Sequence, residues 1–295
     1  MFVAAIERAA QFTRPVHTIC RAWGVEGVIP GAATLFFVNA QGWALTCKHV
    51  AQQLAAANQL AEKYRNFKAD LAKIPQGRHN RHQVRALEQN AGYTKGTIFE
   101  LKHLLVDCVD GELSLEVREH PSADVALLKF SNYTRLHCAS FPVFAKDGSE
   151  LRQGKFLCRL GFPFPEFTNF AYDATRDEIH WTTTGRQATP RFPIEGMVTR
   201  HLGNPDGTAI FGFELSTPGL KGQSGGPAFD PEGRVWGMQS ATNHLDLDFD
   251  VDKEVNRAGQ KRRVQESPFL HVGHCVHVDV LKCFMRENGV AFAEE

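Results

Sequence analysis

The stretch from Lys221 to Ala228 reads K-G-Q-S-G-G-P-A and places Ser224 among three glycines. Because glycine has no Cβ, such a run permits backbone conformations and close approaches that other residues would prevent. Ser224 can then point outward while neighbouring amide groups turn toward one spot, which is what an acyl-transfer nucleophile needs. Ordinary turns have the same composition, so the serine alone does not decide the function.

Two upstream stretches bear on the role of Ser224. Trp43 to Val50 reads W-A-L-T-C-K-H-V and carries His49, and Ser122 to Phe130 reads S-A-D-V-A-L-L-K-F and carries Asp124. A histidine, a carboxylate and a hydroxyl are the general base, the orienting group and the nucleophile of a serine hydrolase. The sequence therefore predicts these three residues as a catalytic triad, in the chain order His, Asp, Ser.

In T-C-K-H-V around His49, A-D-V-A-L-L-K around Asp124 and G-Q-S-G-G-P around Ser224, the chain resembles the trypsin-like (chymotrypsin-fold) serine peptidases. The resemblance runs from roughly Val16 to Gly289. It looks closest to the HtrA-like branch, although no remainder of PDZ-domain size follows. It implies an all-β fold, a chymotrypsin-like double six-stranded β-barrel, with a helical segment inserted after the histidine and a helix near the C-terminus.

The resemblance also assigns roles around the triad. The backbone N–H groups of Gly222 and Ser224 would form the oxyanion hole, where preset donors are typically worth ~3 kcal/mol each. Ser240 would support Asp124. The substrate side chain would bind among Pro218, Leu220, Ser240, Ala241, Thr242 and Gly273. None of these is acidic, and a buried substrate cation would be unpaired there, so a small or medium apolar residue is expected at the cleaved bond.

The segment Gly222 to Gly226 also fits G-x-S-x-G, the nucleophile elbow of α/β-hydrolases. That motif leads from a strand into a helix. Here Ser224 is followed by Gly-Gly-Pro-Ala-Phe and then by the turn Asp230-Pro231-Glu232-Gly233, a pattern that favours a hairpin. The α/β-hydrolase interpretation is therefore disfavoured.

The motifs divide the chain into two parts. Residues 1–140 are expected to form the N-terminal barrel with a helical insertion at about 50–95, and residues 141–295 the C-terminal barrel and closing helix. Val50 to Ile74 has apolar residues at helical intervals, and a break near Asn66 is left open. The inserted helix is either a surface decoration or a docking site for a regulatory protein partner.

Composition narrows the class of protein. The 295 residues are 43% hydrophobic, and 33 basic residues balance 33 acidic ones, so no net field favours nucleic acid or anionic lipid. No stretch resembles a membrane span or a signal peptide. The seven cysteines are scattered and odd in number. We expect a cytoplasmic protein that has neither nucleic-acid nor membrane partners.

Two polar clusters invite metal hypotheses that the sequence disfavours. The acidic run Leu245 to Glu254 lacks the glycine and bidentate glutamate of an EF-hand, so a solvated loop near the cleft is preferred, although its carboxylates could bring charge to the pocket rim. A second cluster comprises His271, His274, Cys275 and His277, but on a strand His274 would face away from the other three. We expect no metal and no organic cofactor.

The sequence thus predicts a serine endopeptidase that hydrolyses protein or peptide substrates through an acyl-enzyme, as an intracellular processing protease. The alternative is a non-catalytic trypsin-fold module that binds peptides or partners, against which the three intact motifs argue. Gln223 stands where secreted relatives have an aspartate that pairs with a newly cut N-terminus. Activation by N-terminal cleavage is therefore not expected.

Overall fold

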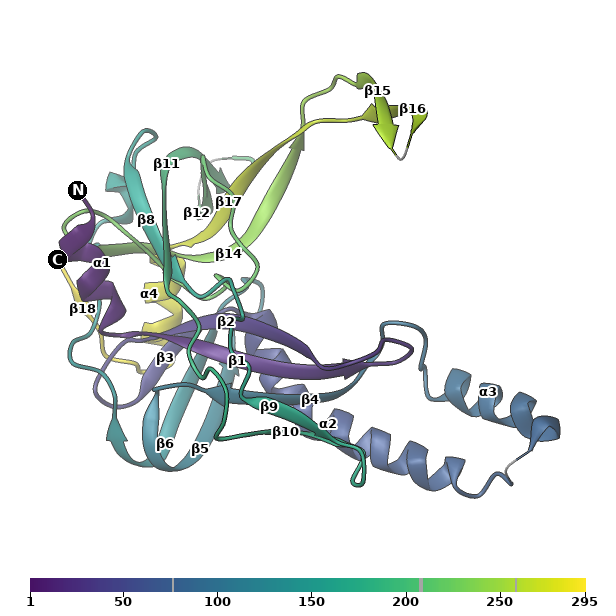
Figure 1. Ribbon diagram of the computed structural model, residues 1–295. Helices are drawn as coiled ribbons and strands as arrows, with labels where there is room; N and C mark the ends of the chain where they lie inside the picture. Colours follow the sequence, from purple (N-terminus) through teal and green to yellow (C-terminus); the bar gives the residue numbers. More distant parts are fainter. Residues whose placement is uncertain (76, 207–208, 258) are drawn as a thin grey trace.

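Two β-sheets, one above the other in Figure 1, carry most of the chain. The computed structural model describes residues 1–75, 77–206, 209–257 and 259–295. Strands outnumber helices throughout, so the all-β class predicted from the sequence is confirmed. No helix among the described residues is both long and apolar enough to cross a membrane.

The first sheet has six strands in the order β4-β1-β2-β3-β6-β5, each antiparallel to its neighbour. The strands are β1 (Thr13–Ala22), β2 (Ile29–Phe37), β3 (Trp43–Thr46), β4 (Ile98–Leu105), β5 (Val109–Glu119) and β6 (Ala126–Leu136). The two edge strands, β4 and β5, are separated along the chain only by residues 106–108. The sheet must therefore curl until its edges meet at that end.

The second sheet closes into a ring of six strands, because β13 pairs with both β8 and β14. The ring runs β13-β8-β11-β12-β17-β14, and two short strands extend it from β14 in parallel pairing. The ring strands are β8 (Phe156–Gly161), β11 (Phe192–Gly203), β12 (Ile210–Leu215), β13 (Pro227–Phe229), β14 (Arg234–Asp246) and β17 (Phe269–His277), and the added strands are β7 (Val143–Phe144) and β18 (Ala293–Glu294). The predicted double six-stranded architecture is thus confirmed, with the first sheet curled and the second closed.

One continuous apolar core joins the two sheets. Buried side chains of the first sheet such as Phe36 meet Phe144 of the second, with ring centroids 6.4 Å apart. An N-terminal helix that the sequence did not suggest, α1 (Val3–Ala10), joins this core from the second sheet's side, where Phe2 contacts Phe229 edge-on at 6.5 Å. The closing helix α4 (Val278–Glu287) was predicted, and the side chain of His277 caps it by accepting from the amide of Asp279.

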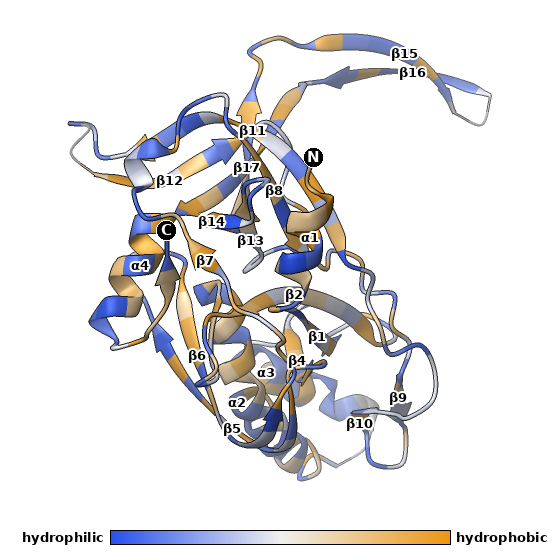
Figure 2. Cartoon of the chain, turned by 90° about the vertical axis from the view of Figure 1, so that its left-hand side faces the viewer, coloured by the Kyte–Doolittle hydropathy of each residue, from blue (hydrophilic) through white to orange (hydrophobic). Residues whose placement is uncertain are grey.

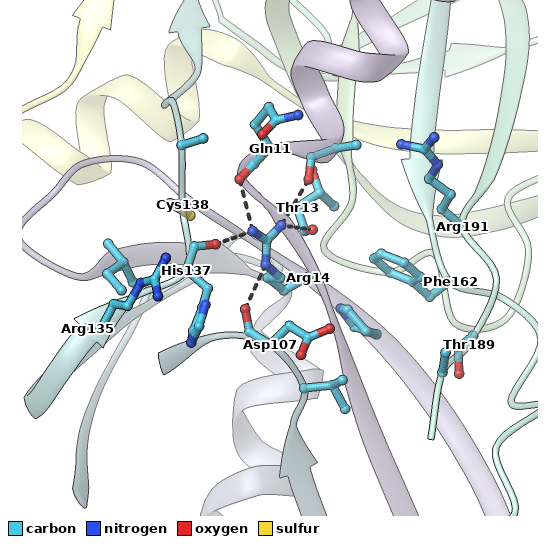
Figure 3. Close-up of a pocket in the computed structure, with 16 residues that line it drawn as sticks. Gln11, Thr13, Arg14, Asp107, Arg135, His137, Cys138, Phe162, Thr189 and Arg191 are labelled. Carbon is cyan, nitrogen blue, oxygen red and sulfur yellow. Dashed lines mark hydrogen bonds between the residues drawn. The ribbon is translucent and has the colours of Figure 1, made fainter. Parts of the chain in front are cut away.

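Arg14 ties together three segments at the junction of the two halves (Figure 3). Its guanidinium donates to the carbonyl oxygens of Ala10 and Gln11 in the α1–β1 bend (2.9 and 3.1 Å), of Asp107 in the β4–β5 turn (2.8 Å) and of His137 after β6. Backbone carbonyls therefore saturate this cation. We conclude that the cavity beside Arg14 is a structural junction.

The predicted helical insertion is present and projects from the first sheet (Figure 1). It consists of α2 (Lys48–Leu71), the 3₁₀ turn Arg78–Asn80 and α3 (Arg81–Asn90), and α2 runs unbroken through Asn66. An aromatic cluster anchors it to the sheet: Trp23 stacks on Tyr93 at 4.9 Å and meets Phe67 of α2 and Phe99 of β4 edge-on.

Two further hairpins depart from the sequence interpretation. Strands β9 (Phe170–Asp173) and β10 (Glu178–Trp181) come from the C-terminal half but contact the first sheet, where the amide of Ile179 donates to Glu100 at 2.9 Å. Strands β15 (Val251–Arg257) and β16 (Gln260–Glu266) form an arm that stands away from the body in both views (Figures 1 and 2).

The expectation of a solvated loop over residues 245–254 holds only for its middle. Leu245 and Asp246 end β14, residues 247–250 are exposed and lie outside any strand, and β15 begins at Val251. Acidic side chains are engaged within the arm, since Asp252 accepts from Arg263 (2.6 Å) and Asp250 from Gln265 (2.7 Å). The arm therefore carries its carboxylates away from the cleft.

We expect Phe67→Ala to loosen the insertion, because it removes a ring that is only 4% exposed from the cluster that anchors α2. The cost should be ~3 kcal/mol in the free energy of unfolding, with faster hydrogen exchange in α3. Phe211→Ala is the matched control, because that ring is 46% exposed and its loss should change stability by less than ~0.5 kcal/mol. Equal effects of the two substitutions would show that the aromatic cluster is not the anchor.

Candidate active site

His49, Asp124 and Ser224 meet where the two sheets face each other. His49 lies in the first turn of α2, three residues after β3, and Asp124 lies two residues before β6. Because β3 and β6 are antiparallel neighbours with Thr46 opposite Ala126, the end of one and the start of the other lie side by side. Ser224 comes from the second sheet, in the loop between β12 and β13.

Asp124 orients His49. The Nδ1 atom of His49 lies 2.9 Å from one carboxylate oxygen of Asp124 and 3.1 Å from the other, and the His49 amide donates to the same carboxylate at 3.1 Å. Ser240 donates a further hydrogen bond to Asp124 at 2.6 Å, as the resemblance implied. Burial favours the protonated acid, but these hydrogen bonds outweigh burial and hold the pKa of Asp124 well below its usual value.

The Ser224 loop fits against the first sheet only because its neighbours are glycines. A Cβ on Gly225, which has φ +89°, would lie 2.0 Å from the Thr34 carbonyl oxygen, and a Cβ on Gly222, which has φ +102°, would lie 2.7 Å from that of Phe162. Thr34 of β2 fastens the loop, since its amide donates to Ser224 O (3.0 Å) and its hydroxyl to Gly222 O (2.8 Å).

The Ser224 hydroxyl donates to the carbonyl oxygen of Ser240 at 3.1 Å, and among the described residues it makes no hydrogen bond to His49. Ser224 and His49 nevertheless line the same cleft. Rotation about the Cα–Cβ bond of the serine moves its hydroxyl from one acceptor toward the other, and such contacts commonly tighten only when substrate is bound.

Two amides beside the nucleophile are unused. The amides of Gln223, Gly225 and Gly226 each donate to a backbone carbonyl, whereas in the described part of the chain those of Gly222 and Ser224 do not. These two are the donors that the sequence analysis assigned to an oxyanion hole. Having no acceptor in the described part of the chain, they are available to an incoming negative charge.

Cys47 is a buried thiol next to the triad, and its sulfur donates to the carbonyl oxygen of Gln239 at 3.3 Å. One ligand atom from each of Cys47, His49 and Asp124 lies within 4.8 Å of the others, a spacing that a metal ion could bridge. Burial and the nearby charge of Asp124 raise the pKa of the thiol well above its ordinary value, which favours the neutral thiol seen donating to Gln239. The four residues once considered for zinc, His271, His274, Cys275 and His277, are not gathered into such a group among the described residues.

A cavity of about 450 Å³ lies beside Ser224 at the edge of β14. It is lined by Pro218, Gly219, Leu220, Lys221, Ser224, Gln239, Ser240, Ala241, Thr242, His244 and His271. Five of the six predicted substrate-binding residues are therefore among its walls. Gly273 is not, because the guanidinium of Arg159 occupies the space beside it, 2.0 Å from where a Cβ would lie.

The lining differs in character from the apolar pocket expected from the sequence. The expected lack of a carboxylate holds for the part of the chain that the structure describes. However, Gln239, Thr242, Lys221, His244 and His271 add polar groups to a wall that is otherwise mostly apolar, and we refer to this space as the polar cavity. Sequence reasoning missed Gln239 and Arg159, because nothing in their local patterns distinguishes them from other strand residues.

A second cleft of about 450 Å³ lies on the other side of Ser224. It shares Lys221 and Ser224 with the first cavity. Apolar residues dominate its walls: Ile29, Ala32, Ala33, Val50, Ala56, Leu60, Ile98 and Leu101. Because Val50, Ala56 and Leu60 belong to α2, the inserted helix forms one wall of the cleft.

Residues 33–238 match the family model of the trypsin-like peptidase domain, a span that includes all three motif residues. The chain belongs to this family. Solved structures similar to it include the HtrA-type protease AlgW with a tripeptide, at 13% identity and a TM-score of 0.48, covering 97% of this chain and 63% of that one. A second, the same protease with a decapeptide, has 12% identity and a TM-score of 0.48, covering 98% and 68%. Comparison with curated proteins gives no match.

In this trypsin-like peptidase domain we expect Gly225→Ala to be far more destabilising than Gly154→Ala. Both residues have positive φ, near +89° and +87°, but only Gly225 would place its Cβ against backbone, while nothing lies within 4 Å at Gly154. The left-handed conformation should cost each variant roughly 1 kcal/mol, and the overlap should add ~2 kcal/mol or more at Gly225. Urea denaturation measures the difference, and equal losses would contradict the contact.

Proposed function

We propose that this trypsin-like peptidase domain is an active serine endopeptidase. Ser224 attacks the scissile carbonyl, His49 accepts its proton and passes it to the leaving amine, and water then hydrolyses the acyl-enzyme. The observation that carries the proposal is the contact of His49 Nδ1 with Asp124 at 2.9 Å. With Nδ1 donating to the carboxylate, Nε2 is the free acceptor that a general base needs.

The electrostatics of Asp124 fit this role. A carboxyl group whose pKa is held well below its usual value stays ionised while His49 becomes an imidazolium. Asp124 therefore stabilises that cation and does not take the proton itself. Because the pKa of Asp124 is lower in the folded than in the unfolded protein, its ionised carboxylate stabilises the folded state at pH values above the unfolded-state pKa. This stabilisation is lost as the pH falls through the folded-state pKa.

The unused amides of Gly222 and Ser224 support the proposal independently. Negative charge that develops on the carbonyl oxygen in the tetrahedral intermediate needs donors fixed in advance, each worth ~3 kcal/mol to the barrier. The glycine-only contacts of the loop hold these donors before substrate arrives.

The two cavities divide the substrate between them. We assign the residue before the scissile bond to the polar cavity at Ser240 to Thr242, where β14 has passed the end of its pairing with β13 and can pair with an extended peptide. The residues after the bond then lie in the apolar cleft beside α2. On this assignment the inserted helix is part of the binding site, and a regulatory partner on its outer face remains compatible with it.

We also propose that the peptidase works in the cytoplasm. All seven cysteines are free thiols, and Cys47, Cys108, Cys158 and Cys275 are buried where a thiol acts as a small hydrophobic group. Free thiols in this number suit a reducing compartment. A processing role on intracellular protein or peptide substrates follows from that location.

A fluorophosphonate probe tests the activated nucleophile. We expect it to label the protein at Ser224 and to leave Ser224→Ala unlabelled, while the matched control Ser131→Ala is labelled normally.

In peptide hydrolysis, His49→Ala and Asp124→Asn should each lower kcat by on the order of 10⁴, with little further loss when combined, because the triad acts as a unit. Near-full activity of His49→Ala would show that the base is wrongly assigned. An unlabelled wild-type protein would favour the non-catalytic binding module.

Activation should not require cleavage of the chain. Gln223 is fully buried, its side-chain oxygen accepts from the Leu220 amide (3.1 Å) and its nitrogen donates to Phe192 O (3.1 Å). The loop is thus held by neutral hydrogen bonds where secreted relatives use an ion pair with a new N-terminus. We expect the intact chain to react with the probe, as judged by intact mass. Labelling only after a cut within residues 24–31 would contradict this, and Gln223→Asp should slow labelling by burying an unpaired charge.

A further inference from the structure

Arg159 is a fully buried cation for which the mechanism above has no use. It lies on β8 with 0% of its surface exposed. Its guanidinium donates to Gln239 Oε1 (2.6 Å), to the hydroxyl and carbonyl of Thr217 (2.6 and 3.0 Å) and to Pro218 O (3.1 Å), and its Nε–H has no partner. Every one of these acceptors is neutral, and no ion pair within the described ranges includes Arg159.

A buried charge without a counter-ion is unusual. Taking an ion out of water costs several kcal/mol, and proteins usually offset this with an opposite charge. Glu214, a buried carboxylate of the same sheet, is already held by Arg200 (2.6 and 2.8 Å) and by Asn243 (2.7 Å). Arg159 therefore projects an uncompensated positive potential into its surroundings, where the low dielectric strengthens it.

The positive potential of the Arg159 guanidinium acts on the polar cavity beside Ser224. Of the residues that contact the guanidinium, Pro218 and Gln239 line this cavity. The hydrogen bond from Arg159 holds the oxygen of the Gln239 side chain on the buried side. The amide nitrogen of Gln239 is thereby turned to the cavity wall, where it donates to Ala241 O at 2.6 Å and fills the space beside Gly219.

The other polar side chains that line the cavity are either basic, like Arg159, or neutral. Lys221, His244 and His271 line it, and the two imidazoles share a hydrogen bond between their Nδ1 atoms at 2.5 Å. None of the described lining residues is a carboxylate. The acids between the cavity and the arm have hydrogen-bond partners of their own, because Asp246 accepts from the Asp248 amide and Asp250 from Gln265 and Ser267.

We propose that this cavity selects an acidic side chain, glutamate or aspartate, at the residue before the scissile bond, and that Arg159 is the positioning residue that sets this preference. The proposal rests on the peptidase function proposed above. A substrate carboxylate supplies the counter-charge that Arg159 lacks and accepts hydrogen bonds from the donors of the wall. It replaces the apolar preference expected from sequence, which did not include Arg159 or Gln239.

A matched peptide series tests the preference directly. Four fluorogenic peptides that differ only in the residue before the cleaved bond, Glu, Gln, Leu or Lys, are compared by kcat/KM. We expect Glu to exceed its neutral isostere Gln by about tenfold or more and Lys to be the poorest. Higher kcat/KM for Leu or Lys than for Glu would overturn the proposal.

A substitution that cancels the charge of Arg159 tests whether this residue causes the preference for Glu over Gln. Arg159→Met risks unfolding, because it removes a buried side chain that ties three segments. Gln239→Glu is close to isosteric and places a carboxylate 2.6 Å from the guanidinium, which cancels the charge at the loss of one hydrogen bond to Ala241 O, and its thermal unfolding is compared with that of the wild type. The Glu-to-Gln ratio of kcat/KM should then fall to about one. Gln153→Glu, the same change at an exposed site of the second half, should leave the ratio unaltered. An unchanged ratio in Gln239→Glu would exclude Arg159 as its source.

The outcomes separate this proposal from the peptidase function. If the probe labels Ser224 but Glu is not preferred, the specificity proposal fails and the peptidase function stands. If the probe does not label, the peptidase function fails, and binding is measured with Ser224→Ala and two peptides that end in Glu or Leu. Tighter binding of the Glu peptide supports an acid-selective cavity in a binding module, whereas equal binding excludes it.

Discussion

The contact between Thr34 of the first sheet and the Ser224 loop of the second is the constraint on which the site depends. Thr34 donates to Ser224 O and Gly222 O, and its own carbonyl accepts from Thr46 at 2.7 Å, so β2, β3 and the loop form one unit. His49 and Asp124 belong to one sheet and Ser224 to the other. Only when the sheets are docked through this contact do the three groups face one cleft, which is why residues so far apart in the chain can act together.

In the proposed function, strand β14 connects catalysis to substrate selection. Gln239 and Ser240 are consecutive residues at an irregularity in the pairing of β14 with β17, and one reaches Arg159 while the other reaches Asp124. A buried cation and a partly exposed carboxylate, Asp124, are thus held by neighbouring residues of a single strand. The carboxylate is compensated by hydrogen bonds and, in the proposed mechanism, by the imidazolium of His49. The cation lacks such compensation, and in our proposal the substrate supplies it.

The elements added to the two sheets affect the site to different degrees. Helix α2 begins at the residue before His49 and forms a wall of the apolar cleft, so its aromatic anchor at Phe67 also restrains the base. The β15–β16 arm, by contrast, leaves the body just beyond the polar cavity and keeps its acids for its own hydrogen bonds. Helix α2 therefore forms part of the proposed substrate site, whereas the β15–β16 arm adds no carboxylate to the walls of the polar cavity.

The sequence by itself indicated the candidate triad residues, the glycines of the loop and the inserted helix, because each is marked by a local pattern of neighbouring residues. It also predicted five residues of the polar cavity. It did not indicate α1, the return of β9 and β10 to the first sheet, or the role of Arg159. These depend on contacts between distant segments, such as Arg159 with Gln239. Periodicity tells which side of a strand is buried, but only tertiary packing decides which charges and donors meet there.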